Sequence, residues 1–441
     1  MSRVLLIELR RSAALGTALI LAVAGVVLLY FAGDAEAFKT GWMQLAMNQR
    51  LFLAVLWPLA LAAGAWQASR EHRSKVAELF DSTPRPTAHR TVPTLGVMAV
   101  AVICGYLVMG IAGGLSIIST AEYLPVGVFV VTAVGALALV AAVWLGQAIG
   151  RLLPWLLTAP ALGIAGLALL LLIPAATRPH GWLALVFSPI YEMNMPSAYA
   201  TVPGKVSAAQ AVWLAALAGT AVLLSVAGSR RLRVAALLPV ALGAALAIAV
   251  MPHQNRIVTD AVDPVAKALV CTDDEPRVCV GRVHSGLLSA VTAPAREGLA
   301  ALAKLPGAPT LVHEDTTTYF PDVYPQWRTD VTLVRVNAGA SGHVVDKGGV
   351  RGAVVTGAFA SPPGCEESAP APDRFAAAYW LIGREPLMGD FYEPEEVAEA
   401  MRLWNDLRRL PEGEAQARVA ALRQAALACA ASDGLFPQDK P

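Results

Sequence analysis

The chain has 441 residues, of which 56% are hydrophobic and 15% are charged. Soluble domains average about 25% charged residues, so this composition predicts a membrane protein. The formal net charge of +1, with no basic face or basic tail, argues against a nucleic acid as a partner.

Seven apolar runs are long enough to cross the core of a bilayer, which takes about 20 helical residues. The first run has the basic flank of a signal peptide, but its length favours a retained span. The seventh is short enough to be a buried helix, yet arginines abut its start and no nearby segment would cover it. The runs are residues 13–32, 51–68, 92–118, 126–149, 155–175, 208–228 and 234–251. They predict a transmembrane domain at residues 1–251 and a second domain at residues 252–441.

Lysine and arginine are unevenly shared between the two sets of loops, and in membrane proteins the short cytoplasmic loops carry the excess. The richer set contains Arg3, Arg10, Arg11, Arg70, Arg73, Lys75, Arg85, Arg90, Arg151, Arg230, Arg231 and Arg233. The poorer set contains Lys39, Arg50, Arg178 and Lys205. This bias predicts a multi-pass plasma-membrane protein with a cytoplasmic N-terminus and an extracellular C-terminal domain.

The densest cluster of charge is residues 70–90, between the second and third apolar runs. Val76, Leu79 and Phe80 follow helical spacing and predict a short amphipathic helix. Pro84 disfavours helix at the residue before it and so marks the end of this helix. Two interpretations remain open: a docking helix for a partner protein, or a solvated loop whose charge only fixes the topology.

The membrane-embedded part holds two further signals. Residues 177–206 mix aromatic residues with prolines and form either a segment that dips into the outer interface or an ordinary exterior loop. The apolar runs hold no charged residue away from their ends, which argues against an ion-coupled carrier. Gly146 and Gly150 are spaced so that helices can approach closely, a weak signal in a chain rich in glycine and alanine.

Four of the five cysteines, Cys271, Cys279, Cys365 and Cys429, fall in the C-terminal domain. An even set favours disulfides in an oxidising compartment over four free thiols in a cytosolic domain, because the loop charges also place this domain outside. Proximity pairs Cys271 with Cys279 and leaves Cys365 for Cys429, among three possible connectivities.

The C-terminal domain mixes helical and strand patterns, which predicts an α+β fold with a disulfide framework. Residues 284–305 predict a helix that Pro294 kinks or divides. Residues 331–336 predict a half-buried strand and residues 352–358 a second one, and the tail beyond them predicts helices.

The search for catalytic motifs gives no match. His313 and Glu314 begin an H-E-x-x-H motif, but Thr317 stands where the second histidine is needed. His284, His313 and His343 could meet in space, although widely separated histidines are more often surface residues. Neither a phosphate-binding loop nor a G-x-S-x-G motif occurs. The sequence therefore predicts no enzyme activity and no metal or cofactor bound by this chain.

The layout resembles the permease subunits of type-2 ATP-binding-cassette exporters. The shared features are a short interfacial N-terminal helix, a charged cytosolic loop after the second span, a re-entrant-looking segment between the fifth and sixth spans, and an uncharged membrane interior. The resemblance covers roughly residues 1–230. The family core usually ends after six spans, whereas here a seventh carries an added domain.

The resemblance implies that the charged loop docks an ATPase, because a run of charge, an apolar turn and a Ser-Thr-Pro exit precede the third span. The implied docking residues are Arg70, Glu71, Arg73, Lys75, Val76, Glu78, Leu79, Phe80 and Pro84. ATP and Mg²⁺ would then bind to a separate ATP-binding-cassette ATPase subunit, and a second permease copy or paralogue would complete the pathway. A rival hypothesis is a membrane-anchored extracellular sensor or binding protein, which predicts a cytosolic output module that the sequence lacks.

Overall fold

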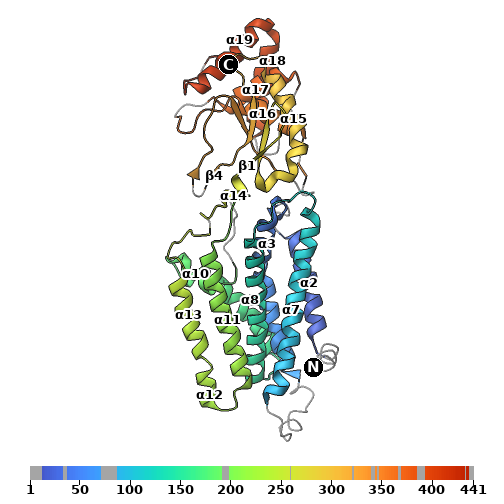
Figure 1. Ribbon diagram of the computed structural model, residues 1–441, viewed down its shortest axis with the longest axis vertical. Coiled ribbons are helices and arrows are strands. Elements are labelled where there is room, and N and C mark those ends of the chain that lie inside the picture. Colours follow the sequence, from blue (N-terminus) through green and yellow to red (C-terminus); the bar gives the residue numbers. More distant parts are fainter. Residues whose placement is uncertain are drawn as a thin grey trace. The chain divides into compact units, whose positions relative to one another are not determined.

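The computed structural model divides the chain into a helical unit, residues 1–118 and 124–262, and a C-terminal unit, residues 119–123 and 263–441 (Figure 1). The structure describes residues 12–32, 37–70, 87–190, 198–258, 260–319, 322–338, 343–344, 347–365, 369–384, 393–432 and 434–436.

The helical unit consists of apolar helices that run alongside one another (Figure 1). Helices suit this composition because they satisfy every backbone polar group within one segment, as hydrocarbon requires. The helices are α2 (Ala14–Phe31), α3 (Trp42–Leu51), α4 (Leu53–Ala68), α7 (Thr87–Ile117), α8 (Gly127–Leu152), α9 (Thr158–Ala176), α10 (Gly181–Phe187), α11 (Gly204–Val226), α12 (Arg230–Ala235) and α13 (Leu238–Val250), with a 3₁₀ turn η1 (Ala37–Thr40). In the described part of the chain, six helical stretches are long and apolar enough to span a membrane when α12 and α13 (Arg230–Val250) count as one, or seven if the bent pair α3 and α4 is also one span. A membrane-embedded helical protein with six or seven candidate spans is thus supported.

The second span differs from the prediction at its start. The sequence predicts a span that begins at residue 51, but α3 precedes α4 and meets it at an angle of 50°. Residues 42–51 were missed because Gln44, Gln49 and Arg50 make them too polar for an apolar run. All three polar side chains are nevertheless buried.

Helices α4 and α8 approach closely because both carry glycine at the contact. A Cβ on Gly64 would lie 2.1 Å from the carbonyl oxygen of Val143, and a Cβ on Gly146 would lie 2.0 Å from that of Leu61. The weak glycine signal in the sequence therefore marks a real helix–helix contact.

Replacing Gly146 with alanine is expected to lower the stability of the helical unit by about 1–3 kcal/mol, the usual cost of overpacking. The new methyl group would collide with a main-chain carbonyl of α4, which cannot move aside as a side chain can. The thermal unfolding midpoint in detergent measures the effect. Gly219→Ala on α11 is the matched control, because a Cβ there meets nothing within 4 Å. Equal midpoints for the two variants would contradict the close packing of α4 on α8.

The C-terminal unit contains a four-stranded sheet in the order β1-β2-β3-β6. Strands β1 (Leu269–Cys271) and β2 (Val278–Gly281) pair antiparallel, whereas β2, β3 (Leu311–Glu314) and β6 (Val331–Val334) are parallel. Strands β4 (Thr318–Tyr319) and β5 (Asp322–Val323) form a separate pair. The helices are α14 (Pro264–Lys267), η2 (Arg282–Leu287), α15 (Leu288–Leu302), α16 (Lys347–Gly357), α17 (Ala371–Ile382), α18 (Pro394–Arg409) and α19 (Glu412–Leu427).

One apolar core joins the sheet to the helices of this unit. It includes Val278 of β2, Val312 of β3, Val334 of β6, Val354 of α16 and Phe375 of α17, each at most 2% exposed. The α+β expectation agrees with this architecture, and the strand predicted at residues 331–336 is present as β6. The domain therefore has a core of its own.

One prediction for the C-terminal unit is wrong, and another is narrowed to one of its two alternatives. Residues 352–358 do not form a strand, because α16 runs through them to Gly357. A short apolar run has no period that distinguishes a helix from a strand. A helix buries Val350, Val354 and Val355 on one side, so it accommodates the run as well as a strand would. Of the two alternatives for Pro294, a kink or a division, the structure excludes division, because α15 is continuous with the buried proline inside it.

Residues 119–123, between α7 and α8, belong to the C-terminal unit. Ser285 donates a hydrogen bond through Oγ to Glu122 Oε2 at 2.9 Å, and Tyr123 donates through its hydroxyl to Asp263 Oδ2 at 2.7 Å. Burial raises the pKa of Tyr123 to about 12, helped by the hydrogen bond to Asp263 and its charge, with Arg282 opposing. Tyr123 therefore remains a hydrogen-bond donor throughout the neutral range.

Candidate functional site

The predicted ATPase-docking segment is described only at its first residue. Arg70 follows α4 and is exposed. The other predicted docking residues, Glu71, Arg73, Lys75, Val76, Glu78, Leu79, Phe80 and Pro84, lie outside the described residues. The docking helix therefore stays a prediction from the sequence.

The end of α4 and the start of α7, which flank this segment, both pack beside the end of α8, and we call this end of the helical unit the basic end. Arg151, at the end of α8, donates through Nη1 to Thr91 Oγ1 on α7 at 2.5 Å and to the carbonyl oxygen of Ser225 on α11 at 3.3 Å. Gln67 of α4 accepts from the backbone N–H of Ala13, before α2, at 2.8 Å. The start of α12 follows α11 at this end and carries exposed Arg230, Arg231 and Arg233. Exposed positive charge is thus gathered where residues 71–86 connect α4 to α7.

A charged residue lies inside the helical unit, which corrects the expectation of an uncharged interior. Arg50, near the end of α3, is 0% exposed. The sequence assigned it to an exterior loop because it precedes the apolar run of α4. The break between α3 and α4 instead turns residues 42–51 into the bundle, and Arg50 is carried inward with them.

Hydrogen bonds to three described residues hold the Arg50 guanidinium. The carbonyl oxygen of Pro189 accepts from Nε at 3.0 Å and from Nη2 at 2.6 Å. Gln210 Oε1 on α11 accepts from Nη2 at 3.0 Å, and the carbonyl oxygen of Val131 on α8 accepts from Nη1 at 3.4 Å. Gly135 leaves room for the side chain, since a Cβ there would lie 2.9 Å from Arg50 Cδ. One side chain therefore links the broken span to α8, α11 and the segment after α10.

Three buried glutamines extend this arrangement, and with Arg50 we call them the polar core: Gln44, Gln49, Arg50 and Gln210. Gln210 donates through Nε2 to the carbonyl oxygen of Leu185 in α10 at 2.7 Å. Gln44 donates to the carbonyl oxygen of Ala198 at 2.8 Å, and Gln49 to that of Tyr106 at 3.3 Å. The segment predicted to dip into the membrane is thus held by main-chain carbonyls on both sides of residues 191–197. A charge inside a membrane-embedded bundle is costly and usually marks a functional position.

The polar core was not predicted, although the sequence holds a signal for it. Arg50 is the only charged residue between Lys39 and Arg70, and two glutamines lie within six residues before it. Polar residues at this density that lead directly into an apolar run, with no turn signal between them, are typical of a broken span.

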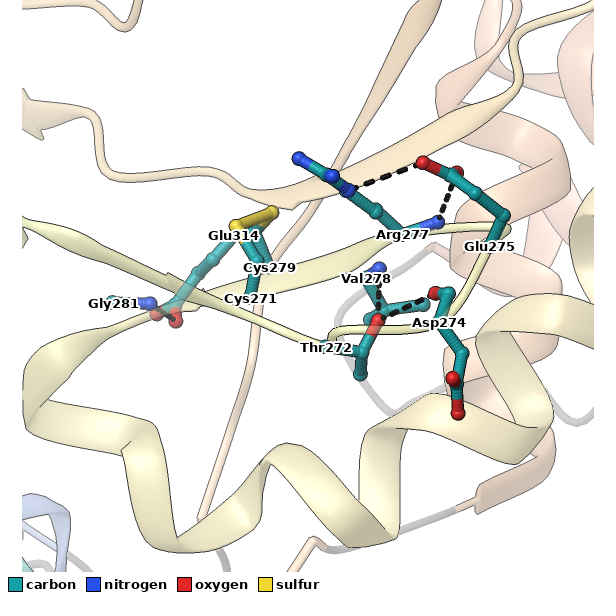
Figure 2. Close-up of a disulfide and its surroundings, with 9 residues drawn as sticks. All are labelled: Cys271, Thr272, Asp274, Glu275, Arg277, Val278, Cys279, Gly281 and Glu314. Atoms are coloured by element: carbon teal, nitrogen blue, oxygen red, sulfur yellow. Dashed lines mark hydrogen bonds and ion pairs between the residues drawn. A yellow bond between two sulfur atoms is a disulfide. The ribbon is translucent and has the colours of Figure 1, made fainter.

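Both predicted disulfides are present in the C-terminal unit, Cys271–Cys279 and Cys365–Cys429. Cys271 and Cys279 are opposite each other in the β1–β2 pair, and Figure 2 shows the bond crossing from one strand to the other. The turn between them is closed by Thr272, whose Oγ1 accepts from the backbone N–H of Val278 at 3.2 Å. Arg277 pairs with Glu275 at 3.1 Å beside the turn (Figure 2). The disulfide and the turn together staple an edge hairpin of the sheet.

The expectation that the histidines are surface residues is wrong for His284. It is 4% exposed, and its Nδ1 lies 2.6 Å from Oε1 of Glu314, which is 3% exposed. Glu314 Oε2 accepts from the backbone N–H of Gly281 at 2.6 Å, as Figure 2 also shows. In strand β3 the neighbouring His313 points to the opposite face, because side chains alternate along a strand. Among the described residues, no three His, Cys, Asp or Glu side chains are grouped to hold a metal ion.

Lowering the pH below 6.5, the ordinary pKa of histidine, is expected to destabilise the C-terminal unit through His313. Burial lowers the pKa of His313, the charge of Arg328 lowers it further, and Asp330 opposes both. The unfolded chain therefore binds this proton more tightly, and the contribution to stability is lost as the pH falls through the folded pKa. His313→Gln should flatten the decline of the urea unfolding midpoint with falling pH. An equally steep decline in the variant would contradict this assignment.

Comparison of the chain with protein-family models, with curated protein sequences and with solved structures gives no match.

Proposed function

We propose that the chain is the membrane-spanning permease subunit of a type-2 ATP-binding-cassette transporter that works as an exporter. A separate ATPase subunit binds ATP and Mg²⁺, and a second permease copy or paralogue completes the pathway. The observation that carries the proposal is the basic end, where the charged segment at residues 70–90 joins two spans among exposed arginines. A soluble ATPase needs such a surface to act on a protein that has no nucleotide site of its own.

The packing of α4 supports a mechanical role for this segment. An ATPase that closes on nucleotide would push on the segment and hence on the ends of α4 and α7. Helix α4 contacts α8 with main chain against main chain at Gly64 and Gly146, so displacement of α4 must carry α8 with it. The α3–α4 break and the polar core lie further along the same span and would be the place where such a movement is absorbed.

The proposed topology, with a cytoplasmic N-terminus and an extracellular C-terminal unit, is supported by residues 119–123. They follow α7 directly and form hydrogen bonds within the C-terminal unit. If α7 spans the membrane, the segment before it and the C-terminal unit belong on opposite sides, however the bent pair is counted. The excess of arginine at the basic end favours the cytoplasm for that side.

Affinity purification of the tagged chain in mild detergent, followed by mass spectrometry, tests the proposal. We expect an ATPase with a phosphate-binding loop to co-purify, and we expect the double reversal Arg73→Glu with Glu78→Lys to abolish its recovery. Lys205→Glu, an exposed charge at the start of α11, is the control and should leave recovery unchanged. Failure to recover an ATPase even after chemical crosslinking would reject the transporter.

The membrane-anchored sensor or binding protein remains the second candidate, because the C-terminal unit has its own core and also holds the α7–α8 loop. A ligand bound there would act on two spans at once. This candidate predicts co-purification of a signalling partner in place of an ATPase, so the same experiment separates the two.

A further inference from the structure

We propose that a crevice between α9 and α11 binds the acyl chain of a phospholipid or of a transported amphiphile of the same chemistry. The binding itself is independent of the proposed function, whereas the role as cargo rests on it. The crevice has a volume of about 320 Å³, in the range of small-molecule sites. Its lining comes from Trp57, Leu145, Leu169, Leu170, Ile173, Ala176, Thr177, Phe187, Pro189, Trp213 and Leu217.

The chemistry of the lining selects an apolar occupant. Leucine, isoleucine and aromatic side chains form nearly all of the surface, and the hydroxyl of Thr177 donates to the carbonyl oxygen of Ile173 in its own helix. Water needs two to four polar partners to be stable in a cavity, which this lining does not offer. A hydrocarbon chain fills such a space and gains dispersion contacts from every wall.

The outer wall of the crevice connects it to the surface that would face lipid. Leu169 lines the crevice and is 50% exposed, while its neighbours Leu171 and Leu172 are 69% and 61% exposed. Leu170, between them, is 2% exposed and lies against the interior. An acyl chain can therefore enter the crevice sideways from the hydrocarbon core of the bilayer, without passing through water.

The end of the crevice near the end of α9 suits a phosphate-bearing headgroup. Thr177 lines the crevice, and exposed Arg178 follows it directly. Phe187 and Trp213 meet edge to face there, with ring centroids 5.0 Å apart, as aromatic residues do near membrane interfaces. The chain would lie along α9 and α11, and its headgroup would lie by Arg178.

Pro189 connects the crevice to the polar core. This residue belongs to the lining, and its carbonyl oxygen accepts two hydrogen bonds from Arg50. Movement at the α3–α4 break would therefore shift one wall of the crevice. In a transporter this link would couple occupancy by the chain to the state of the broken span.

Photocrosslinking in nanodiscs tests the site. The full chain is placed in phosphatidylcholine discs with a small share of phosphatidylglycerol that carries a diazirine in one acyl chain. We expect crosslinks on Leu170, Ile173 and Leu217, which are at least half-buried, as well as on exposed Leu242 and Leu246 of α13. Leu217→Trp should lower the crevice crosslinks about tenfold and leave those on α13 unchanged. Leu145→Trp is the second variant should the first fail to fold, as judged by size-exclusion chromatography.

Crosslinks confined to exposed leucines, or crevice crosslinks unchanged in a folded filled variant, would overturn the proposal. Addition of the ATPase partner and ATP distinguishes the two possible sources of the acyl chain, a resident phospholipid and a transported amphiphile. Release of the probe on ATP hydrolysis identifies cargo, and retention identifies a resident lipid. If the crevice crosslinks but no ATPase can be recovered, the acyl-chain site stands and the proposed transporter function is rejected.

Discussion

Replacing Arg50 with methionine is expected to lower the free energy of unfolding of the helical unit by about 3–5 kcal/mol. Methionine fills much of the volume but leaves the carbonyl oxygens of Pro189 and Val131 and the amide oxygen of Gln210 without their shared donor. Removing the charge also removes its desolvation cost, but the loss of these buried hydrogen bonds, above all the two to Pro189, outweighs that gain. The thermal unfolding midpoint in detergent, compared with that of the unaltered chain, measures the loss.

Arg50→Lys separates geometry from charge at this position, and Lys205→Met is the control. Arg50→Lys keeps the charge but cannot donate to Pro189 through two nitrogens at once, so it should also be destabilised. Lys205→Met removes an exposed charge and should change stability by less than about 0.5 kcal/mol. An Arg50→Met midpoint as high as that of Lys205→Met would show that the polar core does not hold α3, α8 and α11 together.

Removing the Cys365–Cys429 disulfide by a double serine substitution is expected to destabilise the C-terminal unit by about 4 kcal/mol. The bond closes a loop with a sequence separation of 64 residues, which includes α17, α18 and all of α19. The Cys271–Cys279 bond spans only 8 residues, so its removal should cost about 2.5 kcal/mol by the same loop-entropy argument. Pulse proteolysis in increasing urea measures both variants on the full-length protein.

Thiol labelling provides the check on this comparison. Without reductant, a membrane-impermeant maleimide should label none of the four paired cysteines. With reductant and enough urea to unfold the domain it should label all of them, since Cys279 is only 2% exposed in the folded state. Labelling of Cys365 and Cys429 before reduction would contradict the bond itself. A larger urea shift for the Cys271–Cys279 variant would instead contradict the loop-length argument.

The long apolar helices, which are candidate membrane spans, were predictable because hydrocarbon imposes a simple requirement. Each run needs length and freedom from charge, and α2, α7, α8, α9 and α11 meet it, so their sequence ranges and structural ranges differ by only a few residues. The disulfide pairing was also accessible, since Cys271 and Cys279 flank a polar turn and leave a single remaining pair.

The polar core and α16 were not predictable by the same reasoning. Arg50 is stabilised by carbonyl groups that are distant in sequence, such as that of Pro189, and no local sequence pattern predicts these acceptors. In α16 the run at residues 352–358 has no distinct period, so its packing against α15 decides between helix and strand. Glu314 shows the same limit: its partners Gly281 and His284 come together only when β2 and β3 pair.

The place of residues 119–123 in the C-terminal unit has a consequence for the order in which the chain folds. Glu122 and Tyr123 are synthesised 163 and 140 residues before their partners Ser285 and Asp263. The loop between α7 and α8 can therefore reach its final conformation only after the chain through Ser285 has been made and has folded. Chains arrested before that point should be cut by protease within this loop, which makes cleavage there a readout of late maturation.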